Sequence, residues 1–187
     1  MPAAQLMTAR EYMALPVEKG RRTNLVNGEV VVADPTWRHQ AIQVAIVVAI
    51  ANWIEMGERR GAVSSPVDVY ADEQNVYSPD VVWYSECRVP TDPDIRPQAL
   101  PDLAVEVRSP STWRYDIGAK KAGYERGGLP ELWLVDTFAS AVLVFRRSDP
   151  GTPRFDVALE LTTRDVLSSP LLEGFALPLD RLFAERD

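Results

Sequence analysis

Apolar residues recur along this chain in short runs separated by polar turns. Some runs have the spacing of apolar residues that is typical of a helix, and others the spacing typical of a strand. Thr8-Ala-Arg-Glu11 has the spacing of a capping box, which predicts a short helix ending near Leu15. Residues 25–32 form two apolar runs around an Asn-Gly pair, the strongest short signal for a β-hairpin. A long helix is predicted over 39–56, and because its middle is apolar on most faces we expect a sheet to bury it.

Downstream, shorter apolar runs predict strands, and proline-rich or glycine-rich stretches predict their connections. The expected strands cover residues 63–70, 76–84, 103–108, 132–135, 141–145 and 155–161. The proline-rich segment 85–101 is predicted as a loop, a helix is predicted over 114–126, and a further short helix is predicted near Leu179. Together these elements predict an α/β (α+β) domain in which a central mixed sheet packs against one long helix and a second helix.

The length of 187 residues predicts a single domain over residues 1–187. An apolar content of 46% and a charged content of 25% exclude disordered, collagen-like and coiled-coil chains. The longest apolar run, at 44–51, is far below the roughly 18 residues that a membrane helix needs, so no membrane partner is expected. The first 16 residues lack the basic start and continuous apolar stretch of a secretory signal, and we therefore expect a cytoplasmic protein.

The inventory of catalytic side chains is narrow. His39 is the one histidine and Cys87 the one cysteine, which excludes an intrachain disulfide and zinc sites built from several of either residue. The sequence has no nucleophile elbow, P-loop or dinucleotide fingerprint. Any chemistry is expected to use carboxylates and hard cations bound through oxygen. A net charge of −7 argues against a broad non-specific nucleic-acid surface but allows a local basic patch.

The most informative segment is Leu103-Ala-Val-Glu-Val-Arg-Ser-Pro110, which places Glu106 inside a predicted strand. Alternation puts Glu106 and Arg108 on the same face. Burying an unpaired carboxylate there costs several kcal/mol, so Glu106 must be paired, solvated in a cleft or bound to a metal. A simple Glu106–Arg108 pair on an edge strand is the alternative to a functional site.

Two further groups are candidates. Asp80 opens an apolar run after a Ser-Pro pair, although aspartate in that position is also common as a turn residue. Asp116, Lys120 and Tyr124 are spaced by four and share a helical face, and the alternative for them is a solvent-exposed Asp–Lys pair.

Taken together, Asp80, Glu106 and Lys120 suit metal-dependent hydrolysis of a phosphodiester. Two neighbouring carboxylates repel each other unless a cation lies between them. A divalent cation also polarises a phosphoryl oxygen and lowers the pKa of its bound water, while a lysine can orient that water and stabilise the developing charge.

Pro79-Asp80 followed by Glu106-Val-Arg108 resembles the PD-(D/E)XK nuclease signature. The wider pattern resembles one branch of that superfamily, a restriction-endonuclease-like family that was formerly a domain of unknown function. The matching segments run in the family's order, and they are Met7–Tyr12, Leu25–Glu29, Pro35 with His39, Pro79-Asp80, Pro101–Ser111, Asp116 with Lys120 and Tyr124, and Gly128–Asp136. The individual segments have low specificity, but the ordered set is specific.

The resemblance implies a restriction-endonuclease-like fold, with a mixed β-sheet core flanked by helices. It implies that Asp80, Glu106 and the backbone carbonyl of Val107 bind the metal. The signature lysine usually lies two residues after the glutamate, where this chain has Arg108. In this branch the lysine lies on the next helix, which matches Lys120, and the resemblance makes Asp80, Glu106 and Lys120 the catalytic residues.

The resemblance also matches Glu29 and His39 to positions that line the same cleft. Glu29 could instead face solvent, and His39 could instead cap or pack a helix. Arg108 is too basic to act as a base, but it could hold a phosphate. The family usually carries glutamate where this chain has Asn24. The pairs Arg21-Arg22, Arg59-Arg60 and Arg146-Arg147 could contact phosphates, or they could be solvated surface charges.

The leading hypothesis is a Mg²⁺- or Mn²⁺-dependent endonuclease that hydrolyses nucleic acid, with DNA favoured over RNA. By analogy with the fold, a homodimer is expected, since it supplies a second site for the second strand of a duplex. The alternative is a catalytically inactive nuclease fold that acts as a scaffold or binding module, which the −7 charge and Asn24 favour. A third hypothesis, a carboxylate-pair glycosidase, predicts metal-independent activity with a bell-shaped pH profile.

Overall fold

A computed structural model describes residues 6–16 and 21–184 of the protein. Residues 1–5, which belong to the N-terminal segment assessed above for a secretory signal, lie outside the described residues. The helices are α1 (Ala9–Met13), α2 (Trp37–Glu55), α3 (Trp113–Tyr115), α4 (Lys121–Arg126) and α5 (Leu179–Phe183), with a 3₁₀ turn at Glu86–Arg88 and a π-helical turn at Asp116–Lys120. The strands are β1 (Arg22–Val26), β2 (Glu29–Ala33), β3 (Ala62–Ser64), β4 (Val69–Asp72), β5 (Asn75–Tyr77), β6 (Val81–Tyr84), β7 (Leu103–Val107), β8 (Glu131–Asp136), β9 (Ala141–Arg146), β10 (Val157–Leu161), β11 (Val166–Ser169) and β12 (Leu172–Pro178).

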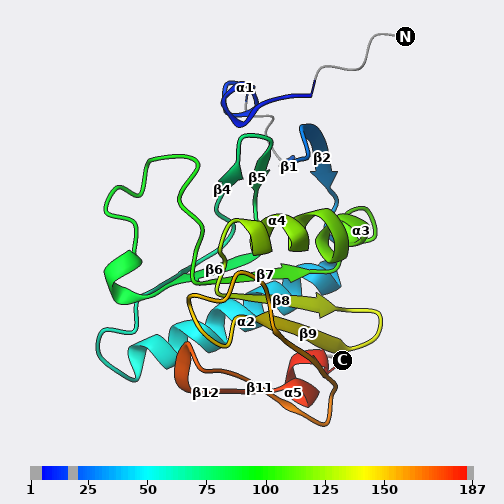
Figure 1. The fold of residues 1–187 in the computed structure, drawn as a ribbon. Helices are drawn as coiled ribbons and strands as arrows, with labels where there is room; N and C mark the ends of the chain where they lie inside the picture. The colour runs from blue at the N-terminus through cyan, green and yellow to red at the C-terminus, as the bar shows by residue number, and fades with distance from the viewer. Residues whose placement is uncertain (1–5, 17–20, 185–187) are drawn as a thin grey trace.

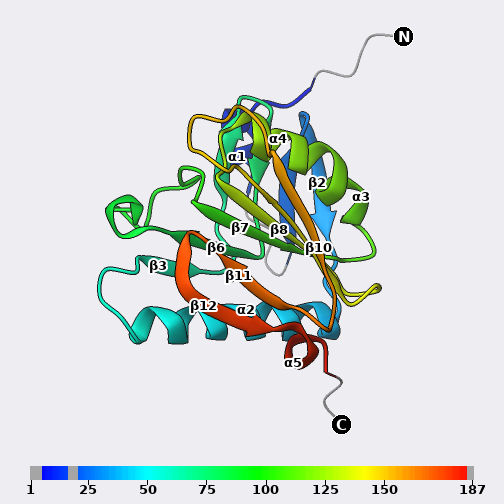
Figure 2. The ribbon, with the colours of Figure 1, turned by 60° about the horizontal axis from the view of Figure 1, so that its bottom comes forward.

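The larger sheet contains six strands in the order β10-β9-β8-β7-β6-β3. β7 and β8 run parallel, and the other neighbouring pairs in this sheet are antiparallel. α2 lies behind this sheet near α5 and the β11–β12 hairpin, whereas α3 and α4 lie in front of it (Figure 1, Figure 2). A mixed sheet flanked by helices confirms the expected fold class.

Strand β7 lies inside this sheet, and all five of its residues are buried. Val105 packs in the core formed with Ile46 of α2, while Ala104 packs in the core on the other face with Tyr124 of α4. Because side chains alternate along a strand, Glu106 faces the same side as Ala104. A strand covered on both faces is normally continuously apolar, so the carboxylate of Glu106 is an exception within the core.

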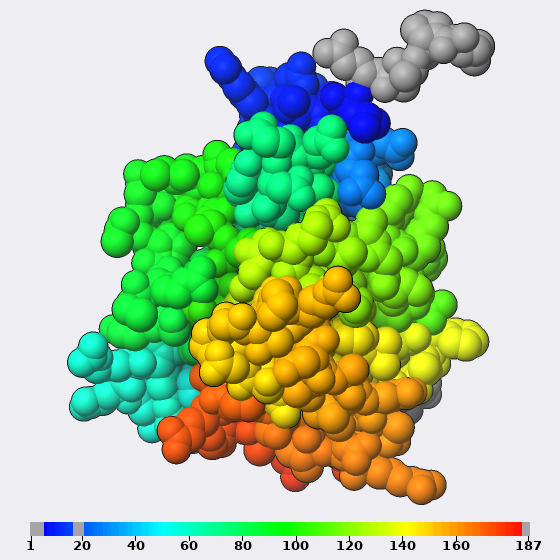
Figure 3. Space-filling view, in the orientation of Figure 1, coloured from blue at the N-terminus to red at the C-terminus, as the bar shows by residue number. Residues whose placement is uncertain are grey.

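The smaller sheet has the order β2-β1-β5-β4. Asn27 and Gly28 have φ angles of 50° and 77°, as a tight two-residue hairpin turn requires, and the predicted hairpin is confirmed. The capping box of α1 is also present, and Ala9 and Tyr12 pack this helix against the sheet. Helix α1 and the β4–β5 hairpin form one end of the molecular surface (Figure 3).

Two of the predicted strands are each divided in two. The segment 63–70 contains β3 and β4, and the segment 76–84 contains β5 and β6, with each pair split between the two sheets. Prolines interrupt both segments, and Ser78-Pro-Asp80 makes the second break. As a result, Asp80 lies where the chain passes from the smaller sheet to the larger one. The β11–β12 hairpin is absent from the predicted elements, because its polar and glycine residues leave a weak apolar pattern.

The prediction that a sheet buries α2 is right for one face only. Ile46 and Ile50 are fully buried, but Val44 is 59% exposed and Val48 is 50% exposed on the opposite face. The helix predicted over 114–126 is present but irregular, since a π-helical turn separates α3 from α4. None of the described helices is long and apolar enough to cross a membrane.

Candidate active site

Segments from five parts of the chain meet at a small cavity of about 10 Å³. A cavity of this size accommodates about one water molecule or one small cation. Three of the predicted catalytic side chains, those of Asp80, Glu106 and Lys120, line it together. The complete lining is Arg22, Asn24, Ala33, Pro35, His39, Ser78, Asp80, Glu106, Ser109, Thr112 and Lys120.

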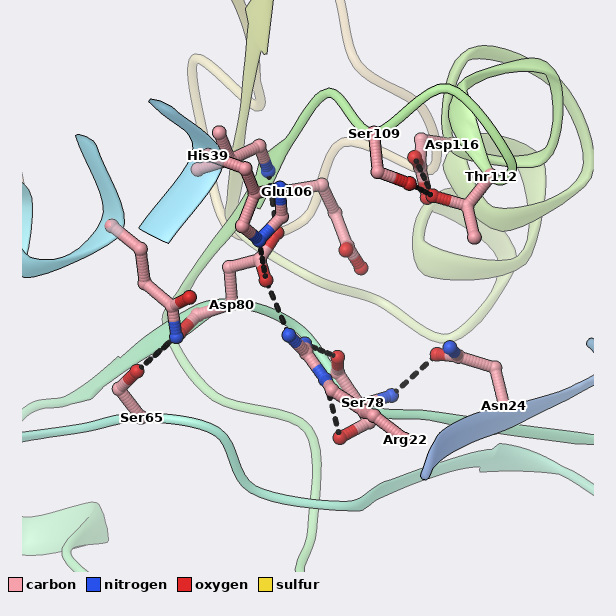
Figure 4. A network of polar contacts seen from close by, with 12 residues as sticks. Arg22, Asn24, His39, Ser65, Ser78, Asp80, Glu106, Ser109, Thr112 and Asp116 are labelled. Atoms are coloured by element: carbon pink, nitrogen blue, oxygen red, sulfur yellow. Dashed lines mark hydrogen bonds and ion pairs between the residues drawn. The ribbon is translucent and has the colours of Figure 1, made fainter. Parts of the chain in front are cut away.

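Asp80 is held at both carboxylate oxygens. Oδ2 accepts a hydrogen bond of 2.6 Å from the backbone N–H of Val107. Oδ1 accepts one of 2.5 Å from Arg22 and lies 3.0 Å from Nε2 of His39 (Figure 4). Burial alone would raise the pKa of Asp80, but the bond with His39 and the charge of Arg22 lower it to about 2. Asp80 is therefore ionised at neutral pH.

A second layer of polar groups fixes the backbone of Asp80. Its carbonyl oxygen accepts hydrogen bonds from Gln43 of α2 at 2.9 Å and from Ser65 at 2.6 Å. Its amide donates to the carbonyl of Val105 at 2.9 Å. The position of Asp80 is thus set by α2, by the segment after β3 and by β7.

Glu106 interacts with the helices in front of the sheet. Its Oε1 accepts a hydrogen bond from the Tyr124 hydroxyl at 2.6 Å and lies 2.6 Å from Nζ of Lys120. Burial, together with the nearby charges of Asp116 and Asp80, raises the pKa of Glu106 to about 7 despite the opposing charge of Lys120. Glu106 can therefore take up or release a proton near neutral pH, and a bound cation would favour its charged form.

The expected alternative of a Glu106–Arg108 pair does not occur. Arg108 instead pairs with Asp136 at 2.9 Å. Its guanidinium also lies over the Phe138 ring at 5.2 Å. Arg108 is absent from the lining of the cavity, so it lies beside the site rather than in it.

Lys120 lies in the π-helical turn and is only 2% exposed. Its Nζ contacts Glu106 at 2.6 Å and Asp116 at 3.0 Å. Burial would lower the pKa of Lys120, but the charges of Asp116 and Glu106 raise it above its usual value, so the ammonium stays charged. The alternative of a solvent-exposed Asp116–Lys120 pair is wrong. π-Helical turns are frequent at functional sites, and this one directs Asp116 and Lys120 inward.

His39 takes part in the site and does not cap the helix. The N-cap is Thr36, whose hydroxyl accepts the amide of His39 at 3.3 Å. The His39 ring bridges Asp80 and the backbone carbonyl of Arg108, the latter at 3.4 Å. Burial would lower the pKa of His39, but its bonds with Asp80 raise it.

Glu29 is not brought to this cavity, since it lies exposed at the start of β2, in register with Val26. Asn24 does line the cavity, and its Oδ1 accepts the backbone amide of Ser78 at 2.7 Å. Trp133 is fully buried in the core, as its position in an apolar strand indicates.

The sequence pattern does not reveal the contribution of Arg22. In the sequence, Arg21-Arg22 looks like the two other arginine pairs, which could all be surface charges. In the structure, Arg22 donates hydrogen bonds to Asp80 and Ser78. The other two pairs supply structural contacts: Arg60 bonds the carbonyl of Trp53, and Arg147 bonds main-chain carbonyls including that of Leu129. No local signal separates these three arginines, because each belongs to an Arg-Arg pair in a polar segment.

The donor set of the cavity suits a hard divalent cation. In the described part of the chain, no group of three or more His, Cys, Asp or Glu side chains is arranged around a common point. Mg²⁺ usually takes one or two protein carboxylates and completes its shell with waters and substrate phosphate. Asp80 and Glu106 line one cavity and fit that chemistry, whereas Val107, whose carbonyl is the third expected ligand, is absent from the lining.

Comparisons with known proteins agree with the geometry. A family model described as "Uma2: Putative restriction endonuclease" matches residues 9–180. No curated protein matches the chain. Among solved structures, the chain is similar to one described as a putative nuclease from Anabaena variabilis, with a TM-score of 0.78 and 20% sequence identity over 95% of this chain and 97% of that one. At this identity the likeness supports the fold alone.

Proposed function

The chain belongs to the Uma2 family of restriction-endonuclease-like proteins, and from that premise we propose that it is a divalent-metal-dependent endonuclease acting on DNA. The observation that carries the proposal is the convergence of Asp80, Glu106 and Lys120 on one cavity. These residues come from separate segments of the chain. Two carboxylates and a lysine at one cavity are the groups that metal-dependent phosphodiester hydrolysis requires.

Asp80, Glu106 and the backbone carbonyl of Val107 would hold Mg²⁺ or Mn²⁺. When bound, such a cation supplies Lewis acidity to a phosphoryl oxygen and lowers the pKa of water. The carboxylates of Asp80 and Glu106 are each oriented by a hydrogen bond from a residue that does not line the cavity. The amide of Val107 orients Asp80, and the hydroxyl of Tyr124 orients Glu106.

Lys120 would orient the attacking water and stabilise the negative charge that develops on the phosphate. Since its pKa is raised, Lys120 is protonated at neutral pH and cannot act as a general base. Asp116 holds the ammonium together with Glu106. Arg108 follows the proposed metal ligand Val107 in the chain and could contact a neighbouring phosphate.

The second candidate is a non-catalytic nuclease fold that serves as a scaffold or binding module. The observation in its favour is that Arg22 already neutralises Asp80, while Asn24 stands where the resemblance leads us to expect glutamate. We also propose a homodimer, which would present two sites to a duplex. The cytoplasmic location expected from the sequence stays a prediction.

The test is cleavage of plasmid DNA, single-stranded DNA and RNA with Mg²⁺, with Mn²⁺ and with EDTA. The wild type should cleave DNA with metal only, and Asp80→Asn, Glu106→Gln and Lys120→Met should each lose at least about a hundredfold in rate. Lys121→Met is the matched control, because Lys121 is the adjacent lysine but lies over the Phe145 ring instead.

Retention of cleavage in Lys120→Met would contradict the assigned role of the lysine. Absence of cleavage on all three substrates, together with absence of Mn²⁺ binding by calorimetry, would favour the scaffold. If cleavage persists in EDTA, the metal-dependent mechanism is wrong.

A further inference from the structure

Helix α2 presents a stripe of apolar side chains on the side facing away from the sheet. Trp37 is 89% exposed, Val44 59% and Val48 50%, and Ala41 and Ala51 complete the stripe. The spacings along it alternate between four and three residues, as they do along the seam of a helix that packs on a second helix. Figure 2 shows α2 along one edge of the molecule.

This stripe is unusual because the helix surface around it carries no charge. Between Arg38 and Glu55 the sequence of α2 contains no Asp, Glu, Lys or Arg. A surface helix normally places charged residues opposite its buried face. The buried face of α2 is already formed by Ile42, Ile46 and Ile50, so the helix is apolar on two sides. The outer side therefore has the composition of a covered surface.

The two ends of α2 indicate what covers it. Arg38 is positive and exposed at one end, and Glu55 is negative and exposed at the other. The part of the stripe from Ala41 to Ala51 is also symmetric about position 46: Val44 corresponds to Val48, and Ala41 corresponds to Ala51. A second α2 packed antiparallel across a two-fold axis would therefore meet its own apolar pattern and bring Arg38 near Glu55 of the other copy. A parallel pair would bring like charges together.

We propose that the outer face of α2 is a homodimer interface, in which two copies of this chain pack their α2 helices antiparallel through Val44 and Val48. This inference gives the homodimer proposed above a defined surface, and it does not depend on catalysis. His39 lies near the N-terminal end of α2 and contacts Asp80. The antiparallel pair would consequently direct the two candidate sites toward opposite ends of the paired helices.

The experiment is analytical ultracentrifugation of the full chain. The wild type should sediment as a dimer, and Val44→Glu/Val48→Glu should sediment as a monomer that still unfolds cooperatively by circular dichroism. Leu159→Glu/Val166→Glu is the matched control, since these two apolar residues are 41% and 51% exposed on β10 and β11. The control should remain a dimer. A monomeric wild type, or a dimer that survives the α2 substitutions, would overturn the proposal.

Charge substitutions test the orientation. Arg38→Glu and Glu55→Arg should each raise the dimer dissociation constant, by roughly tenfold, and the double variant should restore it. In a parallel pair the single substitutions would exchange one like-charge contact for another, so unchanged dissociation constants would overturn the antiparallel arrangement.

Lys120→Met should dimerise like the wild type whether or not the protein is a nuclease, which separates failure of this inference from failure of the proposed function. If the wild type is monomeric and loses DNA binding when Val44 and Val48 are substituted, the dimer is wrong and the outer face of α2 binds DNA instead.

Discussion

Arg22 and Asp80 form an ion pair in which Nη1 of Arg22 contacts Oδ1 of Asp80 at 2.5 Å. The Asp80 side chain is 3% exposed and the Arg22 side chain 19% exposed. Arg22 is held further by the carbonyl and the hydroxyl of Ser78. The guanidinium of Arg22, on the first hairpin, thus already neutralises Asp80, which we propose as a metal ligand. Arg22 also lines a groove of about 770 Å³ next to the cavity.

Replacing Arg22 by glutamine should raise the affinity for Mn²⁺. The substitution removes a positive charge from a metal ligand in a site of low dielectric, and we expect a gain of about tenfold or more. Isothermal titration calorimetry measures it directly. Arg21→Gln is the matched control, because it removes the same charge from the adjacent exposed position. Equal or weaker Mn²⁺ binding by the Arg22 variant would show that Arg22 and the metal do not compete.

Replacing Asn24 by glutamate should also strengthen metal binding. Asn24 is 3% exposed and lines the cavity, so a carboxylate there adds a negative oxygen ligand within reach. The same buried charge should destabilise the metal-free protein by several kcal/mol. The measurement is the melting temperature in EDTA and in Mn²⁺, with Asn24→Gln as a neutral control of similar size. If the melting temperature of Asn24→Glu responds to Mn²⁺ no more than that of the glutamine control, the prediction is wrong.

The raised pKa of Glu106 predicts that stability falls as pH increases. Between the usual value of 4.5 and the folded value of about 7, the folded state holds a proton that the unfolded state has lost, so raising the pH favours unfolding. At about 1.4 kcal/mol per pKa unit, the loss is on the order of 3 kcal/mol. The raised pKa of His39 acts in the same direction. The stability that protonated His39 contributes is fully present below its unfolded pKa and is lost as the pH rises through its folded pKa.

Urea denaturation from about pH 5 to about pH 8 in EDTA measures this slope. Glu106→Gln should be less pH-dependent than the wild type and should retain the contributions of His39 and Glu131, whose pKa values are also raised. A wild type whose stability is flat or rises over this range would show that Glu106 titrates normally.

Two glycines near Lys120 should respond oppositely to substitution by alanine. A Cβ at Gly123 would lie 2.0 Å from the hydroxyl of Tyr77, which is fully buried beside the ring of Tyr124. We expect Gly123→Ala to cost about 1–3 kcal/mol through overpacking. A Cβ at Gly118 meets no atom within 4 Å, so Gly118→Ala should be neutral or stabilise by up to about 1 kcal/mol. Thermal denaturation compares the two, and equal effects would show that Tyr77 can move aside without cost.

Local patterns in the sequence were enough to predict many elements of the fold. The Asn27-Gly28 hairpin, the capped helix α1, the long helix α2 and the strand that carries Glu106 each depend on turn conformation or side-chain periodicity, which neighbouring residues determine. The candidate residues Asp80, Glu106 and Lys120 could be selected for the same reason, since a carboxylate in a strand and a helical Asp-Lys-Tyr spacing are visible locally.

Only the tertiary structure decided which of these groups meet and how they are charged. The sequence could not distinguish a Glu106–Arg108 pair from the observed contacts of Glu106 with Lys120 and Tyr124, because strand periodicity gives the face of a residue but not what lies across from it. It could not separate Arg22 from other arginines, nor find the exposed stripe on α2. Burial, pairing and pKa depend on distant segments brought together in space, and those relationships have no local pattern.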